Sequence, residues 1–319
     1  MTNIVRFDSR SIQRSSLADK VRRYLVNARS DNTRRAYASD LGEFQAFCQA
    51  NGMSHLPATP ETVGAYIVAL ADRGRKLSTI KRRLAAISQN HQGLGHESPT
   101  RHTRVRVLLK GIRRTHGDAS SSKEALSIED LRRTLVALPA SIHGVRDRAL
   151  LLIGFAGGFR RSELVGLDLA DVAFTRDGLI VTLRRSKTDQ GGAGRQVAIP
   201  YGSTPLTCPV RALEDWLRAT GITTGPIFRA VTRQGRVRQP MSAQSVALVV
   251  KKAVRRIGLD PAQFGGHSLR AGLCTAAARA GVSEQSIMNQ TGHRSSATLR
   301  RYIRRGELFI DNAAARLGL

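Results

Sequence analysis

The stretch HSLRAGLCTAAARAGVSEQSIMNQTGHRSSATLRRYIRR, residues 267–305, carries an unusual set of reactive side chains. It contains two histidines, His267 and His293, an arginine three residues after the first of them, Arg270, and a tyrosine among arginines, Tyr302. Tyrosine can act as a nucleophile, histidine can move protons, and arginine can hold phosphate oxygens. The set therefore favours the breaking of a phosphodiester bond without a metal.

The composition of the whole chain points to a polyanionic partner. Its 319 residues carry 51 Lys and Arg against 24 Asp and Glu, a formal net charge of +27, and 41% of them are hydrophobic. This length and this hydrophobic content predict a globular chain with two domains. The basic excess is 12 in residues 1–120 and 15 in residues 121–319, so both halves are expected to face the same polyanion. Nucleic acid is the predicted partner, and a membrane is not, because no long apolar span is visible.

Cysteines and lysines are few in this chain. The three cysteines are far apart and odd in number, so they predict neither a disulfide framework nor a zinc site, and they fit a reducing, cytoplasmic location: Cys48, Cys208 and Cys274. Arginine outnumbers lysine, 43 to 8, as a GC-rich genome would also produce. Lys187 therefore stands out in RRSKTDQGG, either as a titratable ammonium or as a solvated turn residue.

Helical and turn patterns divide the chain into four parts. Residues 1–13 are predicted to be a flexible tail, 14–116 a helical domain, 117–125 a linker of sequence GDASSSKEA, and 126–319 a second domain. In the second domain, LIVTLRR (179–185) and RQVAIP (195–200) predict two strands around a glycine-bearing turn, and most of the rest predicts helices. The predicted fold class is mainly α, with a small antiparallel sheet in the second domain.

Two further groups of residues are candidates for function. Arg160 and Glu163 share a helix face just after Gly157-Gly158, either as a surface ion pair or with the arginine aimed into a site. Six basic residues predict a phosphate-contacting face in the first domain, or else a solvated helix face: Arg73, Arg75, Lys76, Lys81, Arg82 and Arg83. No metal site is expected, because the spacing of His267, Cys274 and His293 fits no metal-ligand pattern.

In this order, the motifs resemble those of the tyrosine recombinase (phage integrase) family. The resemblance runs through R-x-x-E-L at Arg160–Leu164, Lys187, H-x-L-R at His267–Arg270, T-G-H at Thr291–His293 and Tyr302. It extends to the first half, where S-x-N-T-x-x-A-Y-x-x-D-x-x-x-F is similar to the family's helical, SAM-like core-binding domain. The domain layout is most similar to that of the simple Cre-type recombinases.

The resemblance implies a C-shaped clamp on double-stranded DNA and a site-specific recombinase that works through a 3′-phosphotyrosyl intermediate. Tyr302 would be the nucleophile and His267 its base, and Lys187 would protonate the leaving oxygen. Arg160, Arg270 and His293 would bind the phosphate, with Glu163 in support. No metal, ATP or other cofactor is expected.

Recombination further implies inverted-repeat target sites and a homotetramer on two duplexes. The amphipathic segment 307–319 is predicted to dock on a neighbouring protomer, or else on its own domain. Two alternatives remain: a type IB topoisomerase, which relaxes DNA, and a non-catalytic DNA-binding protein on the same fold. The target sequence, the spacer length and any need for an accessory protein stay open.

Overall fold

The computed structural model divides the chain into two units, Met1–Ser121 and Ser122–Leu319. It describes residues 17, 19–21, 23–24, 28–117, 123–184, 194–297, 299–300 and 302. The predicted tail (1–13), Lys187 and the predicted docking segment (307–319) lie outside the described residues, as does most of the predicted linker.

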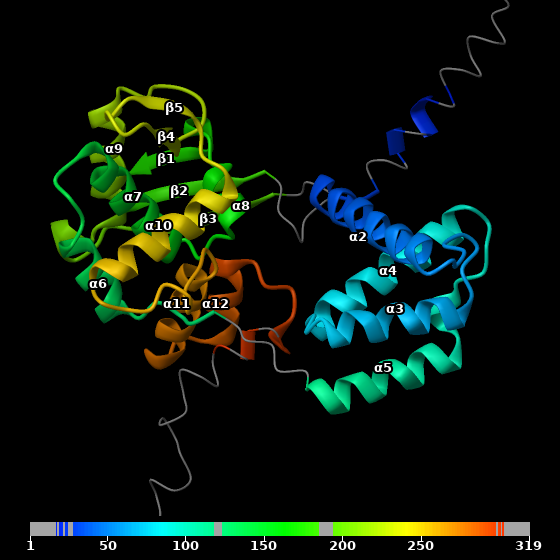
Figure 1. The fold of residues 1–319 in the computed structure, drawn as a ribbon. Coiled ribbons are helices and arrows are strands. Elements are labelled where there is room, and N and C mark those ends of the chain that lie inside the picture. The colour runs from blue at the N-terminus through cyan, green and yellow to red at the C-terminus, as the bar shows by residue number, and fades with distance from the viewer. Residues whose placement is uncertain are drawn as a thin grey trace, which may run out of the picture. The chain divides into compact units, whose positions relative to one another are not determined.

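The first unit is helical throughout its described part (Figure 1). Its elements are α2 (Asp31–Ala50), α3 (Pro60–Asp72), α4 (Leu77–Gly93), the 3-10 turn η1 (Pro99–Arg101) and α5 (Thr103–His116). The Ser30 and Thr59 side chains cap α2 and α3 by accepting hydrogen bonds from the Thr33 and Thr62 amides. The core contains Phe44, Tyr66, Ile67, Ile80 and Ile87, which recur at helical spacing along α2, α3 and α4.

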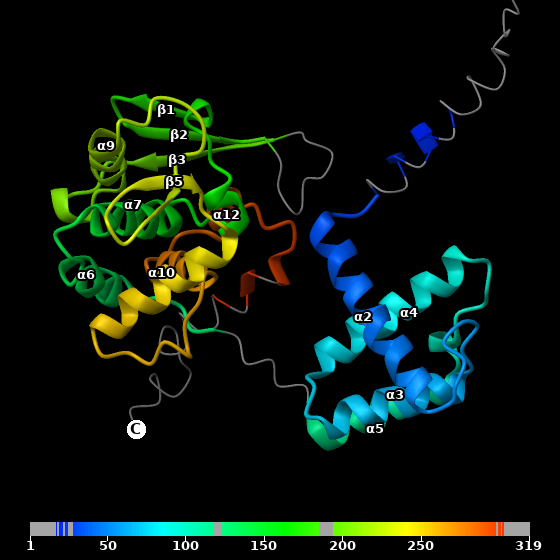
Figure 2. The ribbon, with the colours of Figure 1, turned by 45° about the horizontal axis from the view of Figure 1, so that its top comes forward.

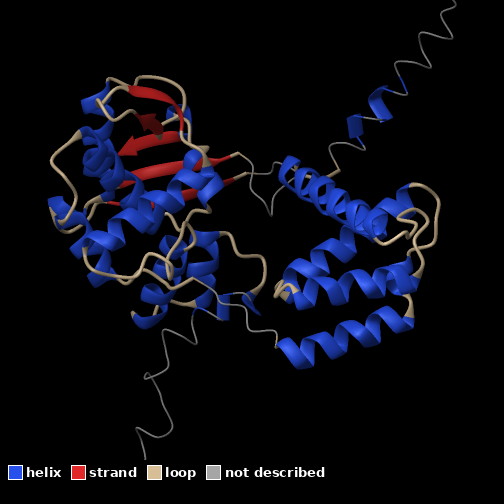
Figure 3. Ribbon diagram, in the orientation of Figure 1, coloured by secondary structure: helices blue, strands red, loops and turns tan. Residues whose placement is uncertain are grey.

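The second unit combines helices with all the described strands (Figure 3). Its helices are α6 (Ile128–Val136), α7 (Ile142–Ala156), α8 (Arg161–Val165), α9 (Pro209–Thr220), α10 (Ala243–Arg256), α11 (Ser268–Arg279) and α12 (Glu284–Thr291), with 3-10 turns η2 (Leu169–Asp171) and η3 (Pro205–Thr207). Its strands are β1 (Val172–Thr175), β2 (Gly178–Leu183), β3 (Arg195–Pro200), β4 (Arg229–Val231) and β5 (Val237–Pro240). The predicted fold class, mainly helical with a small antiparallel sheet, is confirmed.

The sheet β1-β2-β3 is antiparallel and lies against α7 (Figure 2). Val181 of β2 pairs with Val197 of β3, and both are buried with α7 in one core. Helix α7 is apolar on most of its surface, as a helix covered on several sides must be. Trp216 of α9 is fully buried in the same core and donates a hydrogen bond to the Ile227 carbonyl (2.9 Å).

The structure departs from the predicted elements at three short strands. In the part of the second domain that was predicted to be mostly helical, α8 is followed by the turn η2 and by β1, and the hairpin β4-β5 lies further along the chain. These strands are three or four residues long, which is too short to show an alternating pattern in sequence. All three cysteines are buried and free.

Candidate active site

Tyr302 and His267 are in direct contact. The Tyr302 hydroxyl lies 2.5 Å from His267 Nε2, and the ring centroids are 6.0 Å apart. Tyr302 is half-buried and packs on a small cluster that includes Cys274, Ile287 and Leu299. This packing fixes a side chain that lies 35 residues from its histidine in the sequence.

The surroundings of His267 favour its neutral form. His267 is the N-cap residue of α11 and is exposed. Even so, partial desolvation of the ring, followed by the positive charges of Arg270 and Arg160, lowers the pKa of His267. A neutral imidazole with a bare Nε2 can accept the phenolic proton across this short contact.

Arg270 offers a buried cation with an unused donor. The residue is 1% exposed, and its Nη1 donates to the carbonyls of Gly158 and Thr291, each at 2.6 Å. Its Nη2 is buried without a hydrogen-bond partner in the described part of the chain. Desolvation, together with Arg160, lowers the pKa of Arg270 to about 10. An anion that reached Nη2 would satisfy both the donor and the charge.

Gly158 shapes the turn that receives Arg270. Its φ is +57°, a left-handed conformation that side chains with a Cβ rarely adopt. A Cβ there would lie 2.7 Å from Leu273 Cδ2 and 2.9 Å from Thr291 Cγ2. The glycine thus lets α7, α11 and α12 approach one another and places its carbonyl under Arg270.

Arg160 is fixed at the start of α8 by Glu163. The Glu163 carboxylate accepts from Arg160 Nη1 (2.6 Å) and from the Arg160 amide (2.9 Å), an arrangement that also caps the helix. Glu163 is buried, whereas the Arg160 side chain is 18% exposed. The pair is therefore largely buried and is not a surface ion pair.

Arg195, a residue to which the sequence prediction gave no role, joins this group from β3. Its guanidinium donates to the carbonyls of Gln290 (2.9 Å) and Thr291 (3.2 Å) at the end of α12, and lies 3.9 Å from the Glu163 carboxylate. Desolvation lowers the pKa of Arg195. The contacts span about 95 residues of sequence, so no local pattern marks them; the position of Arg195 at the start of a predicted strand is the sequence signal.

His293 follows the left-handed residue Gly292 at the end of α12. Its Nδ1 lies 2.7 Å from the Thr291 hydroxyl, and its ring centroid lies 6.2 Å from that of Tyr302. Desolvation, and then Arg270 and Arg160, lower the pKa of His293 to about 3. In the free protein the ring is therefore neutral.

Comparison with known proteins identifies the family to which this site belongs. Residues 124–307 match the model of the phage integrase family, and residues 22–98 match that of the phage integrase N-terminal SAM-like domain. The chain belongs to the phage integrase family. The predicted family resemblance is confirmed, and the chain is a tyrosine site-specific recombinase.

Two relatives and one solved structure show what this chain is similar to. It is 43% identical to an integrase/recombinase xerD homolog of Selenomonas ruminantium, over 94% of this chain and 89% of the relative. It is 27% identical to the recombinase cre of Escherichia phage P1, over 90% of each chain. The fold is similar to that of a lambda integrase tetramer bound to a Holliday junction, with a TM-score of 0.60 at 17% identity, covering 90% of this chain and 76% of the other.

The predicted DNA-contact cluster of the first unit needs one correction. Five of its members are exposed on the first unit: Arg73, Arg75, Lys76, Lys81 and Arg82. Arg83 is not: it is 4% exposed. Its guanidinium donates to the Tyr66 hydroxyl (2.8 Å) and pairs with Glu43 (2.6 Å) and Asp40 (3.6 Å). The prediction of a DNA contact is wrong for Arg83, because its guanidinium is buried and paired with the buried carboxylate of Asp40 and with Glu43.

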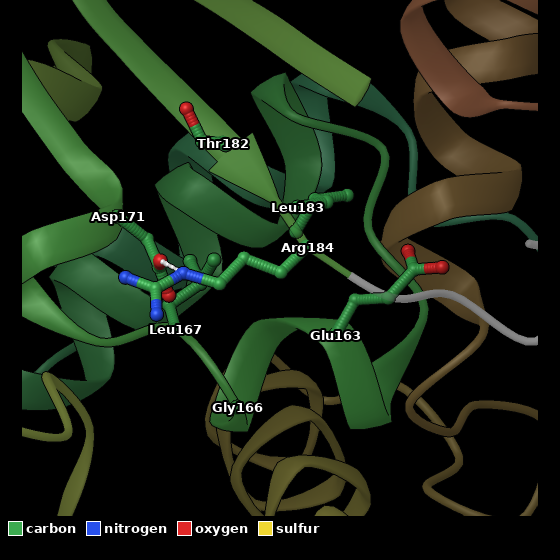
Figure 4. Close-up of a pocket in the computed structure, with 7 residues that line it drawn as sticks. All are labelled: Glu163, Gly166, Leu167, Asp171, Thr182, Leu183 and Arg184. Atoms are coloured by element: carbon green, nitrogen blue, oxygen red, sulfur yellow. Dashed lines mark ion pairs between the residues drawn. The ribbon is translucent and has the colours of Figure 1, made fainter. Parts of the chain in front are cut away.

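A cavity of about 320 Å³ is lined by residues of α8, η2 and β2 (Figure 4). An ion pair between Arg184 and Asp171 (2.6 Å) crosses it, and the Glu163 carboxylate points away from that pair. Of the described candidate residues, only the supporting residue Glu163 lines the cavity. Among the described residues no three His, Cys, Asp or Glu side chains gather as metal ligands, and no helix is long and apolar enough to span a membrane.

Proposed function

We propose that this integrase cuts and rejoins DNA strands through a 3′-phosphotyrosyl link on Tyr302. The observation that carries the proposal is the 2.5 Å contact between the Tyr302 hydroxyl and His267 Nε2, beside a buried Arg270 whose Nη2 meets no acceptor among the described residues. A phenol has a pKa near ~10, so it needs a base and a positive field to attack. In this proposal His267 supplies the base and Arg270 the positive field.

In the proposed reaction Tyr302 attacks the scissile phosphorus while His267 takes its proton. The bond to the 5′-oxygen breaks, and Lys187 gives that oxygen a proton. Arg160, Arg270 and His293 bind the non-bridging oxygens, whose negative charge increases in the transition state. Attack by a 5′-hydroxyl of a second strand reverses these steps, so the bond energy is conserved. The scheme assigns no step to a metal or to ATP.

We also propose that both units contact the DNA. Each half of the chain has a net basic excess, and the five exposed cluster residues give the first unit a surface suited to phosphates. A homotetramer on two inverted-repeat duplexes is the proposed working assembly, in keeping with the lambda integrase tetramer on its Holliday junction. Such work on chromosomal DNA would take place in the cytoplasm. Loss of cooperative assembly on a two-site DNA after deletion of residues 307–319 would support the docking role of that segment.

The experiment begins by finding the target, because the sequence does not name it. Duplexes retained by the Tyr302→Phe variant are selected from a random library, and two copies of the recovered site are placed in a supercoiled plasmid. Exchange between the two copies by the wild type, and none by Tyr302→Phe, is the expected result. Relaxation of a plasmid that lacks the site would instead identify a topoisomerase. Binding without either product would identify a non-catalytic DNA-binding protein.

A further inference from the structure

The Thr291 hydroxyl connects the end of α12 to His293. Thr291 is fully buried, and its Oγ1 lies 2.6 Å from the Ile287 carbonyl oxygen and 2.7 Å from His293 Nδ1. A carbonyl oxygen only accepts, and a hydroxyl has a single hydrogen to donate. The hydroxyl therefore donates to Ile287 and accepts from His293, which requires the proton of the ring to be on Nδ1.

This tautomer decides what His293 can do for a phosphate. A neutral imidazole carries one proton, so with Nδ1 protonated its Nε2 is a bare acceptor. Phosphate oxygens are acceptors as well, and two acceptors form no hydrogen bond. His293 can donate to a phosphate from Nε2 only after a second proton has arrived there.

The charges around His293 act against that second proton in the free protein. Arg270 and His267 face the ring from α11, Arg160 from the start of α8, and Arg195 from β3. Glu163 is the one carboxylate that accompanies these arginines among the described residues, and its two oxygens are held by Arg160. A bound phosphate would bring the missing negative charge together with an acceptor for the new N–H.

We propose that Thr291 is a positioning residue that fixes His293 with its proton on Nδ1, so that His293 takes up a second proton from solvent at Nε2 when an anionic phosphate enters the site. The first half of the proposal concerns the free protein alone. The second half rests on the proposed function, because it needs the DNA phosphate in this pocket.

The tautomer is tested without DNA, by long-range proton–nitrogen NMR of the full chain labelled with ¹⁵N-histidine. The His293 signals are assigned by their loss in His293→Gln. Protonated Nδ1 and bare Nε2 are expected in the wild type and in Thr291→Ser, which keeps the hydroxyl. Thr291→Val, which keeps the volume and removes the hydroxyl, should lose this preference. A proton on Nε2 in the wild type, or an unchanged tautomer in Thr291→Val, would overturn the proposal.

Proton uptake is tested on the selected duplex with the Tyr302→Phe protein, which cannot react. Binding heats in two buffers of different ionisation enthalpy give the number of protons taken up. The expected uptake exceeds that of the Tyr302→Phe/His293→Gln double variant by about one proton per protomer. Equal uptake by the two proteins would refute the second half. Failure to bind the selected duplex would count against the proposed function and would leave the NMR result untouched.

Discussion

Replacement of Glu163 by glutamine should destabilise the second unit well beyond the loss of one surface ion pair. Glu163 is the buried carboxylate that offsets Arg160 and Arg195. Glutamine keeps one acceptor oxygen but removes the charge and turns an amide group toward a guanidinium. The three cations that include Arg270 would then repel one another in a desolvated site.

The magnitude follows from the contacts that are lost. A hydrogen bond to a charged group contributes about 1.5–3 kcal/mol, and both arginine side chains are only about one-fifth exposed, so solvent screens them weakly. With one acceptor retained, the expected loss is about 2–3 kcal/mol of unfolding free energy. For a unit of this size that corresponds to a fall of roughly 4–12 °C in Tm.

The chain offers a specific probe for this measurement. Trp216 is the only tryptophan, and it is fully buried in the second unit, so its fluorescence reports the unfolding of the unit that contains Glu163. Urea is the suitable denaturant because, unlike guanidinium, it does not screen charges. The matched control is Asp215→Asn, which breaks the exposed pair with Arg218 on α9 and should cost less than about 0.5 kcal/mol. If Glu163→Gln lowers the free energy of unfolding no more than Asp215→Asn does, the claim that Glu163 offsets the charges of Arg160 and Arg195 is refuted.

Four further substitutions separate the remaining contributions. Gly158→Ala should lower the free energy of unfolding, measured by Trp216 fluorescence, more than Gly221→Ala does. Both glycines have positive φ, but of these two only Gly158 would place a Cβ against neighbouring atoms. Equal losses of stability would contradict the close approach of Leu273 and Thr291 to Gly158. Arg75→Ala should reduce the slope of log affinity for DNA against log salt concentration by about one, the value of one phosphate contact. Arg83→Ala should instead lower the free energy of unfolding of the first unit by about 3 kcal/mol, as measured by circular dichroism. If Arg83→Ala instead changed only the salt dependence, the burial argument would fail. The pKa of His293 is lowered to about 3 in the folded protein, whereas the unfolded chain takes up this proton below about pH 6.5. The free energy of unfolding should therefore decrease as the pH is lowered below about 6.5. His293→Gln should therefore lose about 2 kcal/mol less than the wild type between pH 7 and pH 5, and an equal loss would contradict the shift.

The sequence predicted the catalytic candidates because each is marked by a motif of only a few residues. His267 and Arg270 at a helix start, and His293 after a glycine, are local arrangements that the structure reproduces. The expectation that His267 and His293 meet Tyr302 came from the family resemblance and not from any periodicity. Lys187 keeps its predicted role as a hypothesis.

Other features depend on tertiary contacts or on patterns that were read incompletely. Arg195 acquires its role only when β3 meets the end of α12, about 95 residues further along the chain. Arg83 could have been recognised as buried, because it lies three residues after Ile80 and four before Ile87, on the apolar face of α4. A count of basic residues does not distinguish that face from the exposed one.

The central claim is that Tyr302 becomes covalently bound to a DNA 3′ end. The direct measurement uses a selected duplex that carries a nick beside the cleavage point, incubated in EDTA without ATP. The adduct is then digested and its peptides are sequenced by mass spectrometry. The account predicts a 3′-linked nucleotide on Tyr302, lost in Tyr302→Phe and retained in Tyr201→Phe. An adduct on another residue, or none on a duplex that the protein binds, would contradict it.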